Sequence, residues 1–404
     1  MSNDSHSSVG AAVNPLGQLD LLDGPDVTVH QGRCVRVRNR NASCTACVDA
    51  CTTGAIAFED GAIKVTPSLC IGCGTCATAC PTCALESHNP DDDALLDICL
   101  AAMRANGGHV TFACQVELDR AFGHCDETKV AHVTCLGRVE ESLLVELVAA
   151  GAKDVALVQE ACDRCRHSSG RDCACEVAES ASSILSAWGV DMPIELVDSL
   201  PESVVAEGVY GTPDETEAPR GDAGRAAGAA GEAPSDGDSG AADAREPRRR
   251  ERFEKVGRDG TLPQFVPTRR GRLLSTLRDL GEAPSEPVAS RLWGEVVIDP
   301  ERCGSCRMCA VFCPTGALRR FSDPQTRTMG VEHVPGRCVA CGTCEAICPH
   351  GSVTLLREVY PSDLYDDHAE RFEMRPPQVE LGRPDTIVNK MRTVLTASKF
   401  VSQA

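Results

Sequence analysis

Aromatic residues are scarce in this chain of 404 residues, because Phe, Trp and Tyr together make up only 3% of it. So low a content disfavours one large core and favours two or three small domains. Long apolar runs are also missing: no stretch reaches eighteen consecutive apolar residues, and the first thirty residues lack a basic start, an apolar stretch and a twin-arginine pair. The sequence therefore predicts a cytoplasmic protein without direct membrane insertion.

Patterns that bind nucleotides or carry out catalysis are absent as well. The sequence has no glycine-rich dinucleotide fingerprint, no Walker loop and no evident nucleophile triad. Its formal charge of -19 disfavours nucleic acid as a partner, since phosphates require a basic surface. We therefore expect no catalytic site of its own and no nucleic-acid partner.

Cysteine, in contrast, is abundant, with 25 residues in three groups that span 34–83, 99–175 and 303–348. No cysteine occurs from 176 to 302. In a reducing cytosol, closely spaced cysteines favour metal or redox chemistry over a disulfide framework. The grouping predicts three modules.

The cysteine-free segment contains a stretch rich in Ala, Gly, Asp and Glu and without aromatic residues, from Pro213 to Arg250. Such a composition buries too little apolar surface to offset chain entropy. We predict a disordered, flexible linker over 207–290. The basic run Arg248–Arg252 within it is either a docking patch or, as we favour, a solvated charge run that balances the preceding acids.

The C-terminal group repeats one motif, C-x2-C-x2-C-x3-C-P, which ends at Pro314 in the first copy and at Pro349 in the second. Three thiolates at this spacing can bind one face of an iron–sulfur cubane, while the fourth reaches the neighbouring cluster. A zinc ribbon needs only two C-x2-C pairs. The predicted ligand sets therefore cross between the copies: Cys303, Cys306, Cys309 and Cys348 for one cluster, and Cys338, Cys341, Cys344 and Cys313 for the other.

The segments "VVIDPERCGSCRMCAVFCPTGAL" and "CVACGTCEAICPHGSV" resemble the bacterial-type ferredoxin domain with two [4Fe–4S] clusters. The resemblance implies a small α+β module over 293–357, in which the two clusters lie close enough for fast electron exchange. A tail over 358–404 follows, and its apolar stripe at Val388, Met391 and Leu395 predicts a helix that docks on a partner or on this module.

A second ferredoxin-like module is predicted over 26–90, where "CIGCGTCATACP" is a complete motif. The upstream cysteine run differs from this motif, because nine residues lie between Cys34 and Cys44 where the motif has two. We expect this insertion, Val35 to Ser43, to form a surface hairpin, and Asp60-Gly61 to form a tight turn between two strands. Cys83 is left as a spare thiol. The crossed sets are Cys34, Cys44, Cys47 and Cys80, and Cys70, Cys73, Cys76 and Cys51.

Between these modules, residues 92–201 alternate helical patterns with short apolar strands. This order predicts an α/β, flavodoxin-like parallel sheet, whose strand ends share one edge. We predict a cysteine site at this edge, with Cys125, Cys173 and Cys175 as alternate ligands. The other interpretation is that the strand-end cysteines are small buried hydrophobes. The site consists of Cys114, Cys135, Cys162 and Cys165.

The segments "HVTFACQ" and "VTCLGRVEESLLVELVAAGAKDVALVQEACDRC" are similar to the iron–sulfur (delta) subunit of methyl-viologen-reducing hydrogenase. The resemblance implies a [2Fe–2S] cluster in the middle module and a link between a hydrogenase and a heterodisulfide reductase. Four thiolates also suit zinc, which stays open as the alternative metal.

These patterns together predict a multi-cluster electron-transfer subunit of an anaerobic oxidoreductase complex, with four [4Fe–4S] clusters and one [2Fe–2S] cluster. Its partners would be redox subunits of the flavin, hydrogenase or disulfide-reductase type. Two other functions stay open: a thiol/disulfide reductase that uses Cys162 and Cys165, and a zinc-stabilised interaction scaffold.

Overall fold

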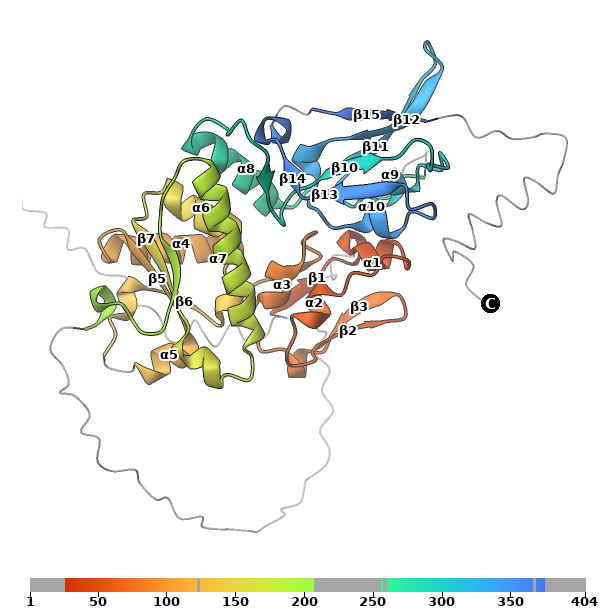
Figure 1. Cartoon of the computed structure of the whole chain (residues 1–404). Helices are drawn as coiled ribbons and strands as arrows, with labels where there is room; N and C mark the ends of the chain where they lie inside the picture. The colour runs from red at the N-terminus through yellow and green to blue at the C-terminus, as the bar shows by residue number, and fades with distance from the viewer. Residues whose placement is uncertain (1–25, 122–123, 207–255, 257–259, 366–367, 375–404) are drawn as a thin grey trace, which may run out of the picture.

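The computed structural model describes residues 26–121, 124–206, 256, 260–365 and 368–374. Its elements gather into N-terminal, middle and C-terminal modules (Figure 1). In this view the N-terminal module lies below the C-terminal module and beside the long helix α7 (Ser169–Ala187) of the middle module. Within the described ranges, no helix is long and apolar enough to cross a membrane.

Two antiparallel strand pairs and three short helices make up the N-terminal module. Asp60 and Gly61 both have positive φ, at 52° and 76°, so they form the predicted tight turn between β2 and β3. Strand β1 pairs with β4. The elements are β1 (Val27–Val29), α1 (Val35–Arg38), α2 (Ala46–Asp49), β2 (Ile56–Glu59), β3 (Ala62–Val65), α3 (Thr75–Ala79) and β4 (Leu85–Ser87).

The middle module is a four-stranded parallel sheet in the order β6-β5-β7-β8, with helices around it. The second strand lies outside the first, as in flavodoxin-like sheets, so the predicted parallel sheet is confirmed. The elements besides α7 are α4 (Asp92–Ala105), β5 (His109–Cys114), α5 (Gln115–Arg120), β6 (Val130–Val133), α6 (Glu141–Ala149), β7 (Asp154–Val158) and β8 (Ile194–Val197).

The core of this module explains its apolar pattern. Leu144 and Leu147 of α6 are fully buried against the sheet, together with Phe112 of β5 and Leu157 of β7. Cys99 on α4 belongs to the same core with no exposed surface, so it packs as a small hydrophobe. This packing leaves the ends of β5, β6 and β7 free to present the other cysteines.

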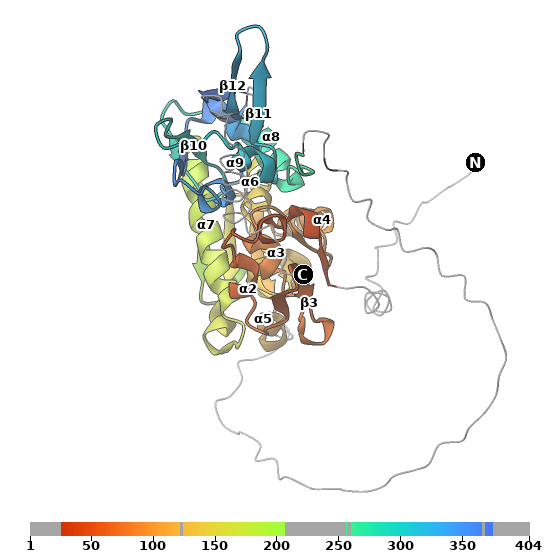
Figure 2. The same cartoon turned by 90° about the vertical axis from the view of Figure 1, so that its right-hand side faces the viewer.

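Three small sheets and two short helices form the described part of the C-terminal module, which Figure 2 shows above the N-terminal module. Strand β15 pairs with β12, so part of the predicted tail belongs to this module's sheet, and the helical stripe from Val388 to Leu395 lies outside the described residues. The elements are β9 (Val288–Ala289), β10 (Glu295–Ile298), α9 (Met308–Phe312), β11 (Leu318–Asp323), β12 (Thr328–His333), α10 (Thr343–Ala346), β13 (Val353–Leu356), β14 (Glu358–Val359) and β15 (Glu370–Glu373).

The linker prediction over 207–290 is wrong at its C-terminal end, where helix α8 (Thr268–Leu280) packs on α6. Leu273 and Leu277 are buried, and the Arg272 guanidinium binds both carboxylate oxygens of Glu146, at 2.8 and 2.6 Å. The averaged composition of the segment hid this short amphipathic helix. Residues 207–255, which include the whole basic run Arg248–Arg252, lie outside the described part of the chain.

Leu277 joins two modules, because it is fully buried in a cluster with Ile184 of α7 and Trp293 of the C-terminal module. We expect Leu277→Ala to lower the free energy of unfolding by about 2–5 kcal/mol, since it removes a buried side chain from a shared core. Urea unfolding of the whole chain measures this loss. Asp279→Ala on the exposed side of α8 is the matched control, and its effect should stay within about 0.5 kcal/mol. Equal effects of the two changes would contradict the role of Leu277 in holding the middle and C-terminal modules together.

Candidate metal centres

The structure brings the predicted site cysteines together in five groups of four. We number them from the middle module (set 1) through the N-terminal module (sets 2 and 3) to the C-terminal module (sets 4 and 5). Four groups are the crossed sets predicted from the cysteine motifs, and one is the set predicted at the edge of the parallel sheet. They are set 1 (Cys114, Cys135, Cys162 and Cys165), set 2 (Cys51, Cys70, Cys73 and Cys76), set 3 (Cys34, Cys44, Cys47 and Cys80), set 4 (Cys313, Cys338, Cys341 and Cys344) and set 5 (Cys303, Cys306, Cys309 and Cys348).

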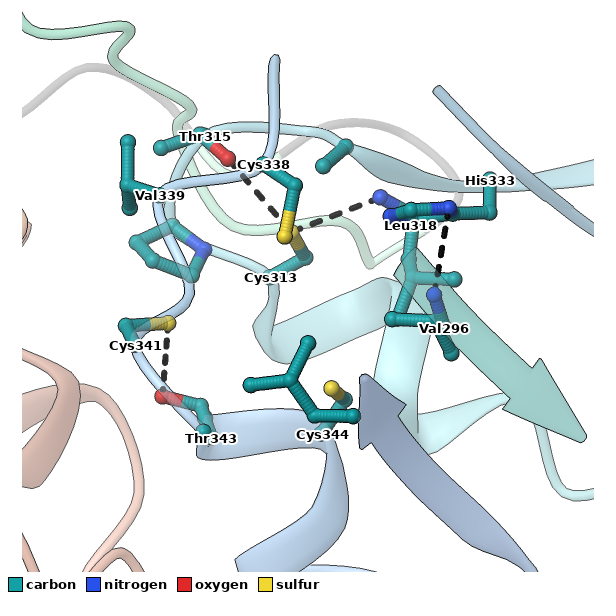
Figure 3. A pocket seen from close by; sticks show the side chains of 14 residues that line it. Val296, Cys313, Thr315, Leu318, His333, Cys338, Val339, Cys341, Thr343 and Cys344 are labelled. Atoms are coloured by element: carbon teal, nitrogen blue, oxygen red, sulfur yellow. Dashed lines mark hydrogen bonds between the residues drawn. The ribbon is translucent and has the colours of Figure 1, made fainter. Parts of the chain in front are cut away.

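Set 4 surrounds a cavity in the C-terminal module (Figure 3). The four thiols come from both copies of the motif, and Val296, Leu318 and Leu355 line the same cavity. Burial, followed by the nearby Cys313 thiolate, raises the pKa of Cys341 to about 11. Thiolates in so apolar a cavity would need a compensating positive charge, which a metal centre would supply.

Set 5 lines a second cavity of the same module, between Ile298, Met308 and Val353. Burial, followed by the thiolates of Cys306, Cys303 and Cys348, raises the pKa of Cys309 to about 12. The fourth cysteine of each C-terminal run therefore lies with the first three of the other run. This is the crossing that the spacing predicts.

Set 3 encloses a cavity in the N-terminal module and includes Cys34, the cysteine that precedes the insertion. Burial, and then the thiolates of Cys80, Cys34 and Cys44, raise the pKa of Cys47 to about 12. Cys34 is itself buried. The insertion thus leaves Cys34 beside the cysteines that the uninterrupted motif would give it as neighbours.

Set 2 is the crossed partner of set 3. Burial is the largest cause of the raised pKa of Cys76, and the next causes are the thiolates of Cys73, Cys70 and Cys51. Thr52 follows Cys51 where the other runs have proline, and its hydroxyl lies 2.9 Å from Nδ1 of His167 in the middle module. This departure from the motif therefore coincides with a contact between modules.

Set 1 lies at the carboxyl edge of the parallel sheet. Cys114 is the last residue of β5, and Cys135 follows β6. Cys162 lies in a 3₁₀ turn after β7 and Cys165 ends it. Burial, then the thiolates of Cys114, Cys135 and Cys165, raise the pKa of Cys162 to about 12. The chain topology thus delivers the predicted thiols to one edge.

Backbone N–H groups point at the sulfurs of several of these cysteines. The N–H of Ala84 donates to Sγ of Cys80 at 3.3 Å, and the N–H groups of Leu318 and Ser352 donate to Cys313 and Cys348 at 3.4 Å. Each acceptor is the fourth cysteine of its run. Such bonds favour the thiolate form and tune the potential of an iron–sulfur cluster.

The sets differ from sites for a single ion. Among the residues that the structure describes, no three His, Cys, Asp or Glu side chains gather into a group that could hold one metal ion. In sets 3, 4 and 5 the four thiols instead line one cavity. A cavity bounded by four thiols fits a centre of several atoms.

The remaining cysteines lie apart from these roles. Cys83 is buried with a pKa raised to about 12, chiefly by burial, and has a φ of 47°, in the left-handed region that Gly316 occupies in the other module. Cys173 and Cys175 are both half-buried on α7. Cys125 forms an isolated bridge with Val205.

Two arginines at the module boundaries are missed by the sequence analysis. Arg269 of α8 donates to the backbone oxygens of Ala77, at 3.0 Å, and of Cys80. Arg38 lies in the insertion, and its guanidinium is buried between the N- and C-terminal modules. The only sequence signal is a set of arginines in polar surroundings, which by itself is typical of a solvated surface.

Comparison with known families gives three matches along the chain. Residues 293–352 match the 4Fe-4S dicluster domain, residues 63–86 the 4Fe-4S binding domain, and residues 114–196 the methyl-viologen-reducing hydrogenase delta subunit. An uncharacterised ferredoxin of Methanocaldococcus jannaschii is 28% identical over 68 residues, which are 17% of this chain and 37% of that protein. The chain thus spans little more than a third of this relative's length. No solved structure gives a significant match.

The matches and the thiol sets define an iron–sulfur electron-transfer protein. The chain carries two 4Fe-4S ferredoxin-type domains on either side of a domain of the methyl-viologen-reducing hydrogenase delta-subunit family.

Proposed function

We propose that sets 2, 3, 4 and 5 each bind one [4Fe–4S] cluster and that set 1 binds a [2Fe–2S] cluster. The observation that carries the proposal is the composition of the cavities. The cavities of sets 3, 4 and 5 are each lined by four thiols, three from one cysteine run and one from the run that crosses with it. This is the ligand pattern of paired cubanes.

The residues around each set would hold the cluster and keep water away from it. The cysteine thiolates would bind iron, and the N–H groups that reach Cys80, Cys313 and Cys348 would stabilise sulfur-centred negative charge. Apolar neighbours such as Phe58 and Leu85 at set 3 would exclude solvent. Bound clusters of this kind supply carriers of single electrons.

Set 1 is the site where the metal matters most for the proposal. The middle domain matches the delta-subunit family, and this resemblance implies a [2Fe–2S] cluster. Four thiolates also suit zinc. Set 1 also lies next to set 2, because the Thr75 hydroxyl that donates to Sγ of Cys73 at 3.5 Å lies against Gly137, two residues after Cys135. A redox centre placed there could exchange electrons with the N-terminal module, whereas zinc could not.

The chain as a whole would serve as a multi-cluster electron-transfer subunit of an anaerobic oxidoreductase complex, of the hydrogenase or heterodisulfide-reductase kind. Redox subunits with a flavin, a hydrogenase site or a disulfide-reductase site would be its partners. The delta-subunit domain supports this class of complex. The alternative is a thiol/disulfide reductase that uses Cys162 and Cys165, which would need only two of the four thiols at this edge of the sheet.

Metal analysis of the whole chain tests the proposal. Protein purified without oxygen should contain about 16 iron atoms, with matching acid-labile sulfide, from four cubanes, before any iron of set 1 is counted. Measurement of zinc in the same samples is the control. Zinc with little iron would instead favour the interaction scaffold and overturn the proposal.

A further inference from the structure

The insertion between Cys34 and Cys44 is not the surface hairpin that the sequence predicts. Residues Val35–Arg38 form helix α1, which faces helices α9 and α10 of the C-terminal module (Figure 1). Val35, Arg38 and Ala42 are buried, at 3%, 9% and 4% exposure. The segment folds inward because the C-terminal module, far away in the sequence, covers it.

Arg38 makes the polar part of this contact. Its guanidinium donates to the backbone oxygens of Phe312, at 3.3 Å, and Cys313, at 3.2 Å, in the C-terminal module. It also donates to the backbone oxygens of Gly32, at 2.9 Å, and Pro263, at 2.5 Å. A buried arginine charge is tolerated only with such partners, so the four bonds fix the relative position of the chain segments that meet there.

The apolar part of the contact includes a cysteine from each module. Val35 and Ala42 form one cluster with Phe312 and Ile347, and Cys44 of set 3 and Cys341 of set 4 pack against it. Burial is the main cause of the raised pKa of Cys341, and a smaller cause is the Cys44 thiolate. Two predicted cluster ligands from different modules therefore lie near each other in a dry contact.

We propose that the inserted segment is the junction of the two ferredoxin-type modules, in which Arg38 holds set 3 against set 4 so that electrons pass directly between the modules. The proposal rests on the proposed function for the presence of clusters, while the junction itself rests on the contacts of Arg38. In one transfer the donor centre is oxidised by one electron and the acceptor centre is reduced by one, and no bond is made or broken.

Contacts between neighbouring sets place the five sets in order along the molecule. Set 1 borders set 2, because the Thr75 hydroxyl that donates to Sγ of Cys73 at 3.5 Å lies against Gly137, two residues after Cys135. Sets 2 and 3 share the core cluster of the N-terminal module, set 3 borders set 4 at the junction, and sets 4 and 5 share the core cluster of the C-terminal module. The middle module thus lies at one end of this order, and the two ferredoxin-type modules contact each other directly.

The test compares Arg38→Ala and Arg38→Lys with Arg40→Ala in the full chain. Arg40 lies two residues further along the insertion and is exposed, so its replacement is a matched control. Lysine keeps the charge of Arg38 but lacks the planar fork that reaches several carbonyl groups. Ala42→Asp, which places a charge in the apolar part, disturbs the junction independently of Arg38.

Two measurements report on the junction itself. Hydrogen exchange of the backbone amides in 308–313 should become about tenfold faster or more in Arg38→Ala, Arg38→Lys and Ala42→Asp, because their covering contact opens more often. EPR spectra of partly reduced protein should lose the spin–spin broadening between the clusters of sets 3 and 4. Both properties should be unchanged in Arg40→Ala.

Iron content separates failure of the junction from failure of the proposed function. We expect all variants to keep about 16 iron atoms, since none of the changes removes a thiol. Unchanged exchange and unchanged spin coupling in the two Arg38 variants and in Ala42→Asp would overturn the junction and leave the clusters in place. A wild-type chain without iron–sulfur clusters would overturn the proposed function, while faster exchange in the variants would still support Arg38 as the structural link.

Discussion

Cys34→Ala should remove about one quarter of the cubane iron, because Cys34 lines the cavity of set 3 with Cys44, Cys47 and Cys80. The EPR signal of the cluster in set 3 should disappear or convert to that of a three-iron species. The cluster of set 2 should persist, although Cys34 and the ligands of set 2 share one module. Iron analysis and EPR of the reduced variant measure both results.

The matched variant is Cys51→Ala, in the same cysteine run as Cys34. Because the ligand sets cross, this change should damage set 2 and spare set 3, which is the opposite pattern. Cys83→Ala serves as a control, since Cys83 is a buried thiol of the same module outside both sets. If Cys34→Ala left every cluster signal intact, the ligand would lie elsewhere, and Cys83 would be the first candidate.

Gly170→Ala should abolish most of the signal from set 1 while the four cubanes persist. Gly170 lies on α7, and a Cβ atom built there would stand 2.2 Å from Sγ of Cys135 and 3.4 Å from the backbone nitrogen of Gly137. A free thiol could rotate away from the added methyl group, but a thiolate fixed by a metal centre could not. The visible and EPR spectra of the full chain report the loss.

Gly271→Ala on helix α8 is the control for this change. A Cβ atom at Gly271 has no neighbour within 4 Å, so the replacement should keep all centres and add up to about 1 kcal/mol of helix stability. A Gly170→Ala protein with an undiminished set 1 signal would remove Cys135 from the ligands of set 1. Cys173, three residues after Gly170 on α7, would then be the next candidate ligand of set 1.

The sequence alone predicts the features that depend on residues within one module. The spacing of the cysteine runs predicts the crossed grouping, because each run has to supply three neighbours and one distant thiol. Alternating helices and strands predict the parallel sheet, and with it the gathering of Cys114, Cys135 and Cys162 at one edge. The Asp60-Gly61 pair predicts a tight turn, and the positive φ of both residues in the structure agrees with it.

Features that depend on contacts between modules could not be predicted in this way. Val35 to Ser43 is polar enough to be a surface loop, and only the C-terminal module buries Arg38. Helix α8 lies beside a segment whose composition predicts disorder, and Leu273 and Leu277 become a core only against α6 and Trp293. The order of the five sets likewise depends on how the modules pack.

The capacity of the chain for electrons tests the central claim most directly. A stepwise reductive titration of anaerobically purified protein, followed by visible and EPR spectra, counts the electrons that one chain accepts. Four [4Fe–4S] clusters and one [2Fe–2S] cluster should together accept about five electrons. A zinc-containing chain that accepts none would contradict the claim that these thiol sets conduct electrons, and a chain that accepts about four would restrict it to the two ferredoxin-type modules.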